Sequence, residues 1–237
     1  MRALRTVVVI LVVLAGLFVA ADRIAVNLAE DEVAKKLKGE LGSTSAGEPS
    51  VSIDGFPFLT QVAGKDLDKV TAEVEGVTAT AGDRRVRLSK ITLAAKDVKL
   101  SGDYSSAVAD RATGTVHLSY ADLSEAADDG VRVEYGGKNA SGKAQVKVTG
   151  SVVLPVLGTV ERSVYSTVSV GEGNTVRLRA DEIPGDKIPG IEGAIRKKTD
   201  FDRTIDKLPQ GIKLTGVSAD KDGVDISMEG SDVHLAG

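Results

Sequence analysis

The chain begins with a block of apolar residues followed at once by a helical pattern. After a short basic start, every residue of the run Thr6–Ala21 is apolar except the first and Gly16. As a helix rising about 1.5 Å per residue, the run spans roughly 24 Å, less than the ~30 Å hydrocarbon core of a bilayer. Val19-Ala20-Ala21 before Asp22 fits a small-x-small cleavage pattern. Residues 1–21 are therefore predicted to be a signal peptide, with an uncleaved membrane anchor as the alternative.

An amphipathic helix is predicted directly after this run, over residues 22–41. Its acidic residues precede its lysines, an order that suits the helix dipole, and Gly42 is placed to end it. The helical pattern continues past Ala21 without a break, which keeps the anchor interpretation open. The apolar positions at helical spacing are Ile24, Leu28, Ala29, Val33, Leu37 and Leu41.

From Pro49 onward the hydrophobic period changes to two, as is typical of half-buried strands. Apolar positions hold one parity within the segments Val70–Val74, Ile91–Ala95 and Ala144–Leu154. Long antiparallel strands are therefore predicted for most of the chain.

The parity of this alternation slips at three places. They lie near Gly76, between Leu88 and Ile91, and between Ala95 and Val98. Such slips indicate β-bulges, and a sheet with repeated bulges is bent.

Turn and helix signals complete the predicted architecture. Gly171–Asn174 and Asp222-Gly223 are typical of hairpin turns. Tyr120–Asp129 predicts a short helix, and residues 190–208 predict a late helix whose apolar side chains share one face. The predicted fold class is α+β, with a long, strongly curved antiparallel sheet and an N-terminal amphipathic helix, and residues 22–237 forming a single domain.

Composition narrows the classes of function. The formal net charge is −4, and the domain loses two further positive charges without Arg2 and Arg5, so nucleic acid is a poor partner. The chain has no cysteine, which excludes both a disulfide framework and a lipid-modified N-terminal cysteine. It has no tryptophan and only four phenylalanines, so aliphatic side chains must fill the interior or leave part of it unfilled.

We find no pattern of residues that points to catalysis, a metal or a cofactor. The two histidines, His117 and His234, lie on separate predicted strands. Residues 137–143 match GxxxxGK, but Ala144 stands where a hydroxyl is needed and a strand follows instead of a helix. We therefore predict a protein that is not an enzyme.

One apolar segment stands out, with the sequence VSIDGFPFLT at residues 51–60. It places Phe56, Pro57, Phe58 and Leu59 in a row, and the proline prevents this row from continuing as a central strand. The segment either plugs one end of the core or presents apolar surface at a mouth or a membrane. From the residues alone, the plug is the favoured interpretation.

Two basic runs lie near the ends of predicted elements. Arg84, Arg85 and Arg87 form the first, and Arg196, Lys197 and Lys198 form the second. They are candidates to attract an anionic headgroup, although solvated faces are the ordinary interpretation of such runs.

Four segments together resemble a known family. They are GFPFLTQV, Ser119–Leu123, Leu208–Leu214 and the terminal DGVDISMEGSDV. In this order they are similar to the actinobacterial LmeA-type family of exported phospholipid-binding proteins. The resemblance implies a lipid-binding domain distantly like tubular folds, in which a curved sheet wraps a helix around an apolar channel.

The resemblance also implies a location and a role: an exported protein of the cell envelope, periplasmic or on the outer face of the plasma membrane, that supports lipid or lipoglycan maintenance. The expected partners are a phospholipid, anionic by preference, and the membrane surface. The alternatives are a structural or interaction module with a filled core, and an enzyme acting on an envelope glycan or lipid. The side chains expected to contact lipid are Phe56, Pro57, Phe58, Leu59, Ile191, Ile195 and Phe201.

Overall fold

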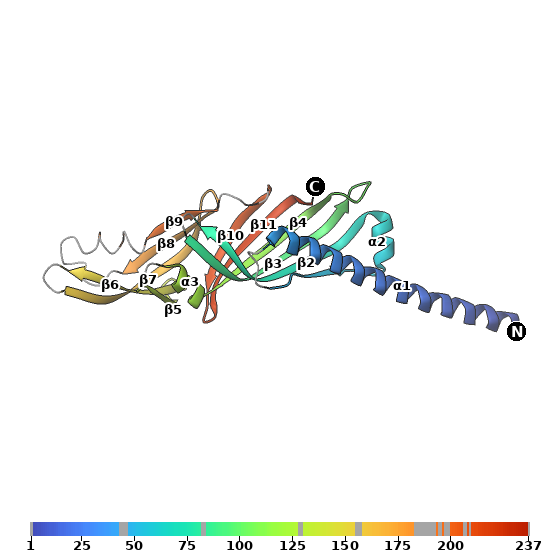
Figure 1. Cartoon of the computed structure of the whole chain (residues 1–237), viewed down its shortest axis with the longest axis horizontal. Coiled ribbons are helices and arrows are strands. Elements are labelled where there is room, and N and C mark those ends of the chain that lie inside the picture. Colours follow the sequence, from blue (N-terminus) through green and yellow to red (C-terminus); the bar gives the residue numbers. More distant parts are fainter. Residues whose placement is uncertain are drawn as a thin grey trace.

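The computed structural model describes residues 2–42, 47–81, 84–127, 130–154, 158–182, 193, 196, 200–205, 208 and 210–236. Within them lie three helices and eleven strands (Figure 1). The helices are α1 (Arg2–Leu41), α2 (Phe58–Gly64) and α3 (Tyr120–Ala126). The strands are β1 (Ser50–Asp54), β2 (Asp66–Ala81), β3 (Arg84–Leu100), β4 (Ala107–Ser119), β5 (Arg132–Lys138), β6 (Ala144–Leu154), β7 (Gly158–Gly171), β8 (Thr175–Glu182), β9 (Phe201–Thr204), β10 (Ile212–Ala219) and β11 (Gly223–Ala236). The predicted α+β class with an N-terminal helix and antiparallel strands is confirmed.

Helix α1 passes the predicted cleavage point without a break and ends before Gly42, whose φ is 54°. Its apolar first half is exposed and extends away from the body of the molecule (Figure 1). By length and composition, α1 is able to cross a membrane. The helix thus fits both a signal peptide and an anchor.

The second half of α1 packs on the domain through small side chains. Ala25, Val26 and Ala29 face the core, whereas Ile24 and Leu28 are exposed. The face that packs therefore coincides only in part with the apolar positions that the helical spacing picked out. The helix turns the neighbouring positions Ala25 and Ala29 toward the sheet, and their short side chains allow the helix to lie close to it.

Strands β1-β2-β3-β4-β11-β10 form a six-stranded sheet in that order, and the described strands do not close it into a barrel. The pairing of β2 with β3 skips one residue in each strand at two places. The first lies between the pairs Val74↔Ile91 and Val77↔Leu88, and the second lies beside Asp97. Gly76 has a φ of 65° and Asp97 a φ of 52°. The predicted slips near Gly76 and between Leu88 and Ile91 face each other, and each irregular place is a bulge of one residue in both strands that leaves the register unchanged.

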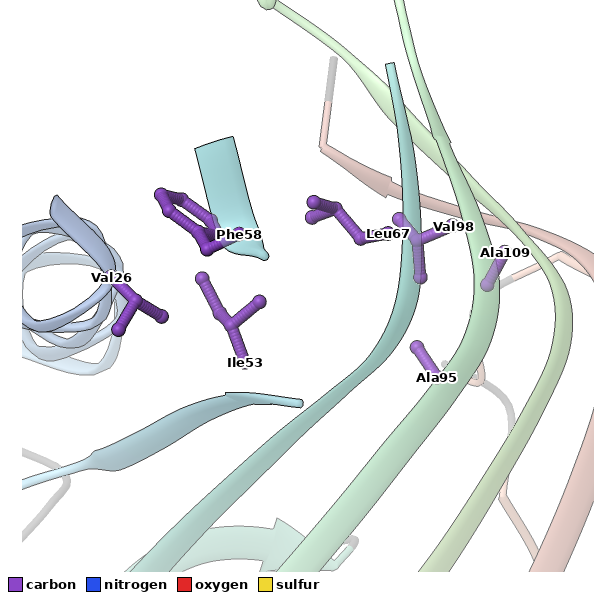
Figure 2. Packing of buried hydrophobic residues seen from close by; sticks show 7 residues of the cluster. All are labelled: Val26, Ile53, Phe58, Leu67, Ala95, Val98 and Ala109. Atoms are coloured by element: carbon purple, nitrogen blue, oxygen red, sulfur yellow. The ribbon is translucent and has the colours of Figure 1, made fainter. Parts of the chain in front are cut away.

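The bulge at Asp97 keeps apolar side chains on one face across the bend. Val70 pairs with Ala95 before it and Leu67 with Val98 after it, and all four belong to one core cluster. We call the face that carries this cluster the inner face. In Figure 2 the strands curve around the cluster, and Val26 of α1 and Phe58 of α2 close it from the opposite side.

Strands β5-β6-β7-β8-β9 form a second antiparallel sheet, so the expected single sheet is divided in two. A second apolar cluster joins the sheets, with Val146 and Leu178 of one against Ala219 and Val224 of the other. The Tyr120 hydroxyl ties α3 to the β10–β11 hairpin by donating to the Asp220 carbonyl oxygen at 2.6 Å, and burial raises the pKa of Tyr120 to about 12.

Several local predictions can be compared with the structure. Both hairpin turns are confirmed, between β7 and β8 and between β10 and β11. The short helix is confirmed as α3, with Ser119 as its N-cap. The late helix is wrong for Phe201–Thr204, which pair with β8 as a short strand, because the edge of β8 offers backbone partners that helical spacing does not reveal. Gly193 and Arg196 are helical, as predicted, and most of the remaining segment lies outside the described residues.

Candidate functional site

The segment predicted to be functional folds as a turn of helix against α1. Pro57 is the N-cap of α2, and its side chain makes no capping hydrogen bond. The carboxylate of Asp22 on α1 takes this role, accepting the Leu59 N–H at 2.8 Å, and its side chain is completely enclosed. Asp22 thus satisfies a free backbone donor of α2 and fixes that helix against α1.

Some side chains of this segment are buried in the core and others are exposed, so both predicted roles, core plug and exposed apolar surface, are found in it. Phe58 is only 6% exposed and closes the core cluster. Phe56 is 58% exposed and Leu59 37% exposed. The guanidinium of Arg23 lies over the Phe56 ring, 5.2 Å from its centroid. The segment therefore plugs the core with one residue and presents apolar surface with its neighbours.

Beyond the plug, the inner face continues as two apolar rows across β2, β3, β4 and β11. Cross-strand partners share a face, and the alternation of β3 places Ile91 and Leu93 on the same side as Ala95. The first row is Ala72, Leu93, Gly114 and Met228, and the second is Val74, Ile91, Val116 and Ile226.

This apolar surface is open at Leu93. Leu93 is 41% exposed and its direct neighbours on the row are the small residues Ala72 and Gly114, whereas Met228 at the end of the row is buried. A Cβ added at Gly114 would meet the side chains of both Met228 and Leu93, so these two side chains converge over the glycine. The row behind them on the outer face is polar, with Glu73, Thr92, Thr115 and Ser227 in register. An open apolar strip on a sheet that is polar behind suits an elongated apolar ligand.

A polar pocket of about 400 Å³ lies at the bulge next to these rows. Its lining residues are Gly47, Glu75, Gly76, Arg87, Ser89 and Asp122. Asp122 accepts hydrogen bonds from the hydroxyls of Ser89 at 2.5 Å and Ser119 at 2.7 Å. Burial opposes its ionisation, but these hydrogen bonds and nearby Arg87 outweigh burial and hold the pKa of Asp122 below its ordinary value of 3.8.

The lowered pKa of Asp122 predicts an acid-dependent loss of stability. A carboxyl with a depressed folded-state pKa stabilises the fold above its unfolded pKa, and this contribution disappears as pH falls below about 3.8. We expect Asp122→Asn to lower stability at neutral pH and to lose less stability than the parent on acidification. Urea midpoints measured across pH 2–7 test this, and parallel acid limbs for both proteins would contradict it.

The other predicted residues do not gather at one place in the described structure. Arg87 lines the pocket, Arg85 is exposed on β3, and Arg84 begins that strand. Arg196 contacts the Ala180 carbonyl oxygen and Asp200, both at 3.4 Å. Phe201 opens β9. Ile191, Ile195, Lys197 and Lys198 lie outside the described residues.

Sequence reasoning missed two parts of this arrangement. The alternation marked Leu93 and Ile91 as apolar, but their assembly with Val116 and Met228 depends on strand pairing. Asp22 carries no local signal, because its partner is 37 residues away.

The comparison with family models shows which protein family the chain belongs to. A model described as LmeA-like phospholipid-binding matches residues 20–229. The chain belongs to the LmeA-like phospholipid-binding family. The match covers both sheets and the domain-packed half of α1, and it begins two residues before Asp22, so nearly all of the apolar run lies outside it. No curated protein and no solved structure matches the chain.

Membership of this family agrees with an apolar strip on the inner face. The match includes the segment around Phe56, all of β2, β3 and β4, and the part of β11 that carries Met228. The residues that build the strip therefore lie within the matched region.

Proposed function

We propose that the protein binds a phospholipid by laying its acyl chains along the two apolar rows of the inner face. The observation that carries this proposal is the open strip around Leu93, in a chain that belongs to a phospholipid-binding family. Covering the strip with an acyl chain removes the apolar surface of the strip from water. Exposing an acyl chain to water costs about 0.8 kcal/mol for each CH₂, so a protein that holds a chain outside the bilayer needs an apolar surface of this kind.

The residues at the end of the strip have a supporting role in this proposal. Phe58 closes the core beside α1, and Phe56, Pro57 and Leu59 lie next to it at the same end. Ile191 and Ile195, between β8 and β9 in the sequence, and Phe201 of β9 are proposed to add lipid contacts. The protein acts as a binding protein and not as an enzyme.

Arg87 is the headgroup candidate with the best support. It lines the pocket at the bulge, four residues along β3 from Ile91. A guanidinium there suits the phosphate of an anionic phospholipid, and the pocket carboxylates of Glu75 and Asp122 suit headgroup hydroxyls or amines. Arg84, Arg85, Arg196, Lys197 and Lys198 are proposed to add longer-range attraction.

Loss of the Arg87 charge should weaken the preference for anionic lipid. One basic residue near an anionic surface contributes about 1 kcal/mol, so we expect Arg87→Gln to lower the affinity for anionic over neutral vesicles by roughly fivefold. Arg162→Gln, an exposed change in the second sheet, serves as the control. Vesicle co-sedimentation measures both, and an equal decrease for the two variants would contradict a role for the pocket.

The proposed setting is the cell envelope. The apolar first half of α1 fits export or anchoring, and the domain would lie in the periplasmic space or on the outer face of the plasma membrane. There it would support the maintenance of envelope lipids or lipoglycans, with a membrane surface as the source of its ligand.

Extraction of the purified protein with organic solvent tests the binding proposal. We expect mass spectrometry to detect co-purifying phospholipid, and the protein to take up phospholipid from anionic vesicles after delipidation. A preparation that carries no phospholipid and takes up none would contradict the proposal and favour a structural module of the envelope.

A further inference from the structure

Exposed aromatic and aliphatic side chains gather at the end of the domain from which the apolar half of α1 emerges. Phe56 and Leu59 belong to the segment that packs on α1, and Tyr104 lies in the β3–β4 loop. The Tyr104 hydroxyl donates to the Val62 carbonyl oxygen of α2 at 3.3 Å, which brings the loop to this end. Figure 1 shows α2 beside α1 where the helix leaves the sheet. We call Phe56, Leu59 and Tyr104 the collar.

Two of the collar residues are paired with cations. Arg23 lies over the Phe56 ring at 5.2 Å, and the Lys65 ammonium lies 5.8 Å from the centroid of the Tyr104 ring. Aromatic rings accompanied by Arg and Lys are typical of the headgroup level of a bilayer, where apolar bodies enter the membrane and charged ends stay hydrated. The collar has this composition although the chain as a whole is poor in aromatics.

The apolar run is short for an anchor, and the collar would make up the missing length. The run Thr6–Ala21 covers roughly 24 Å as a helix, about 6 Å less than a typical hydrocarbon core. Ile24 is exposed on the next turn, and Asp22 is enclosed by the domain and so does not face lipid. If this end of the domain lies in the headgroup layer, Ile24, Phe56 and Leu59 cover the part of the bilayer thickness that the apolar run is too short to span.

The collar is held firmly to the helix that would cross the bilayer. The Asp22 carboxylate accepts the Leu59 N–H at 2.8 Å, and Val26 packs with Phe58 in the core cluster. The orientation of α1 therefore sets the orientation of the collar, so a bilayer that α1 crosses meets the collar directly.

We propose that α1 is retained as a membrane anchor and that the collar is seated in the headgroup layer of the bilayer that α1 crosses. The occupant of this surface is a phospholipid bilayer. The inference rests on the envelope setting proposed above, but it concerns the anchor end and not the lipid-binding strip. It places the inner face beside the membrane that supplies its ligand.

Tryptophan fluorescence tests the seating of the collar, because the chain contains no tryptophan of its own. The full chain with Phe56→Trp is reconstituted in phosphatidylcholine–phosphatidylglycerol vesicles whose acyl chains are brominated near the carbonyl end. Residues at the headgroup boundary lie about 5–10 Å deep, within reach of these bromines. We expect emission from this variant to be quenched several-fold more than emission from Tyr165→Trp, an exposed position in the second sheet.

Two results would overturn the inference. The first is equal quenching of the two variants. The second is an intact mass showing that protein extracted from its native membrane begins at Asp22, since a retained anchor requires residues 1–21. Neither result bears on lipid binding by the inner face, which co-purifying phospholipid reports separately.

Discussion

Replacing Phe58 with alanine is expected to lower the free energy of unfolding by about 3–5 kcal/mol. Phe58 is the largest side chain in its core cluster, where it contacts α1 and the strands together (Figure 2). Its removal leaves a cavity between elements that are far apart in sequence, and the aliphatic neighbours are too short to fill it. Urea unfolding of the full chain in detergent micelles, followed by circular dichroism, measures the change.

Phe56→Ala is the matched control for this prediction. It removes the same ring two positions earlier, from a side chain that is largely exposed, and should change stability by less than about 1 kcal/mol. Similar losses for the two variants would contradict the division of the segment into a plug and an exposed surface.

Leu93→Glu is expected to lower the amount of bound phospholipid at least tenfold. Leu93 lies at the centre of the open strip, and an acyl chain laid across it would have to desolvate the new carboxylate, which costs more than the roughly 1.4 kcal/mol that corresponds to tenfold. Since Leu93 is already part-exposed, the variant should still fold. Quantitative mass spectrometry of extracted lipid, normalised to protein, measures the effect.

Thr92→Glu provides a control with the same charge on the opposite face. The adjacent residue belongs to the polar row with Glu73 and Thr115, so it should leave phospholipid content unchanged. Equal losses in the two variants would indicate that negative charge alone reduces binding, and the inner face would no longer be the lipid site.

The sequence predicts the strands and their bends better than it predicts how they assemble. Parity slips near Gly76 and beside Asp97 locate the bulges, because a bulge changes the side on which each following residue points. The sequence does not show which strands pair with each other. The contact of β4 with β11 joins residues more than 100 positions apart, and alternation carries no information on partners at that distance.

Two of the errors have a common physical cause. The segment Phe201–Thr204 has helical spacing around it but forms a strand, since a free edge on β8 is available. Ile24 and Leu28 lie on the apolar side of α1, yet the sheet packs against Ala25, Val26 and Ala29, which allow a closer approach. In both cases tertiary partners decide between local alternatives of similar free energy.

The candidate site was predictable in its chemistry and not in its geometry. The FPFL segment shows at once that apolar surface is present, but its division between core and exterior depends on Asp22, which fixes α2 against α1. The apolar rows around Leu93 become one surface only after four strands are in register.

Photolabelling by a phospholipid with a diazirine in its acyl chain tests the central claim most directly. After uptake of the probe by the full chain and irradiation, residue-level mass spectrometry locates the attached lipid. We predict labels on inner-face residues, Leu93, Val116 and Met228 foremost, and not on the outer-face residues Thr92 and Thr115. Labels on the outer face, or only on α1, would contradict it.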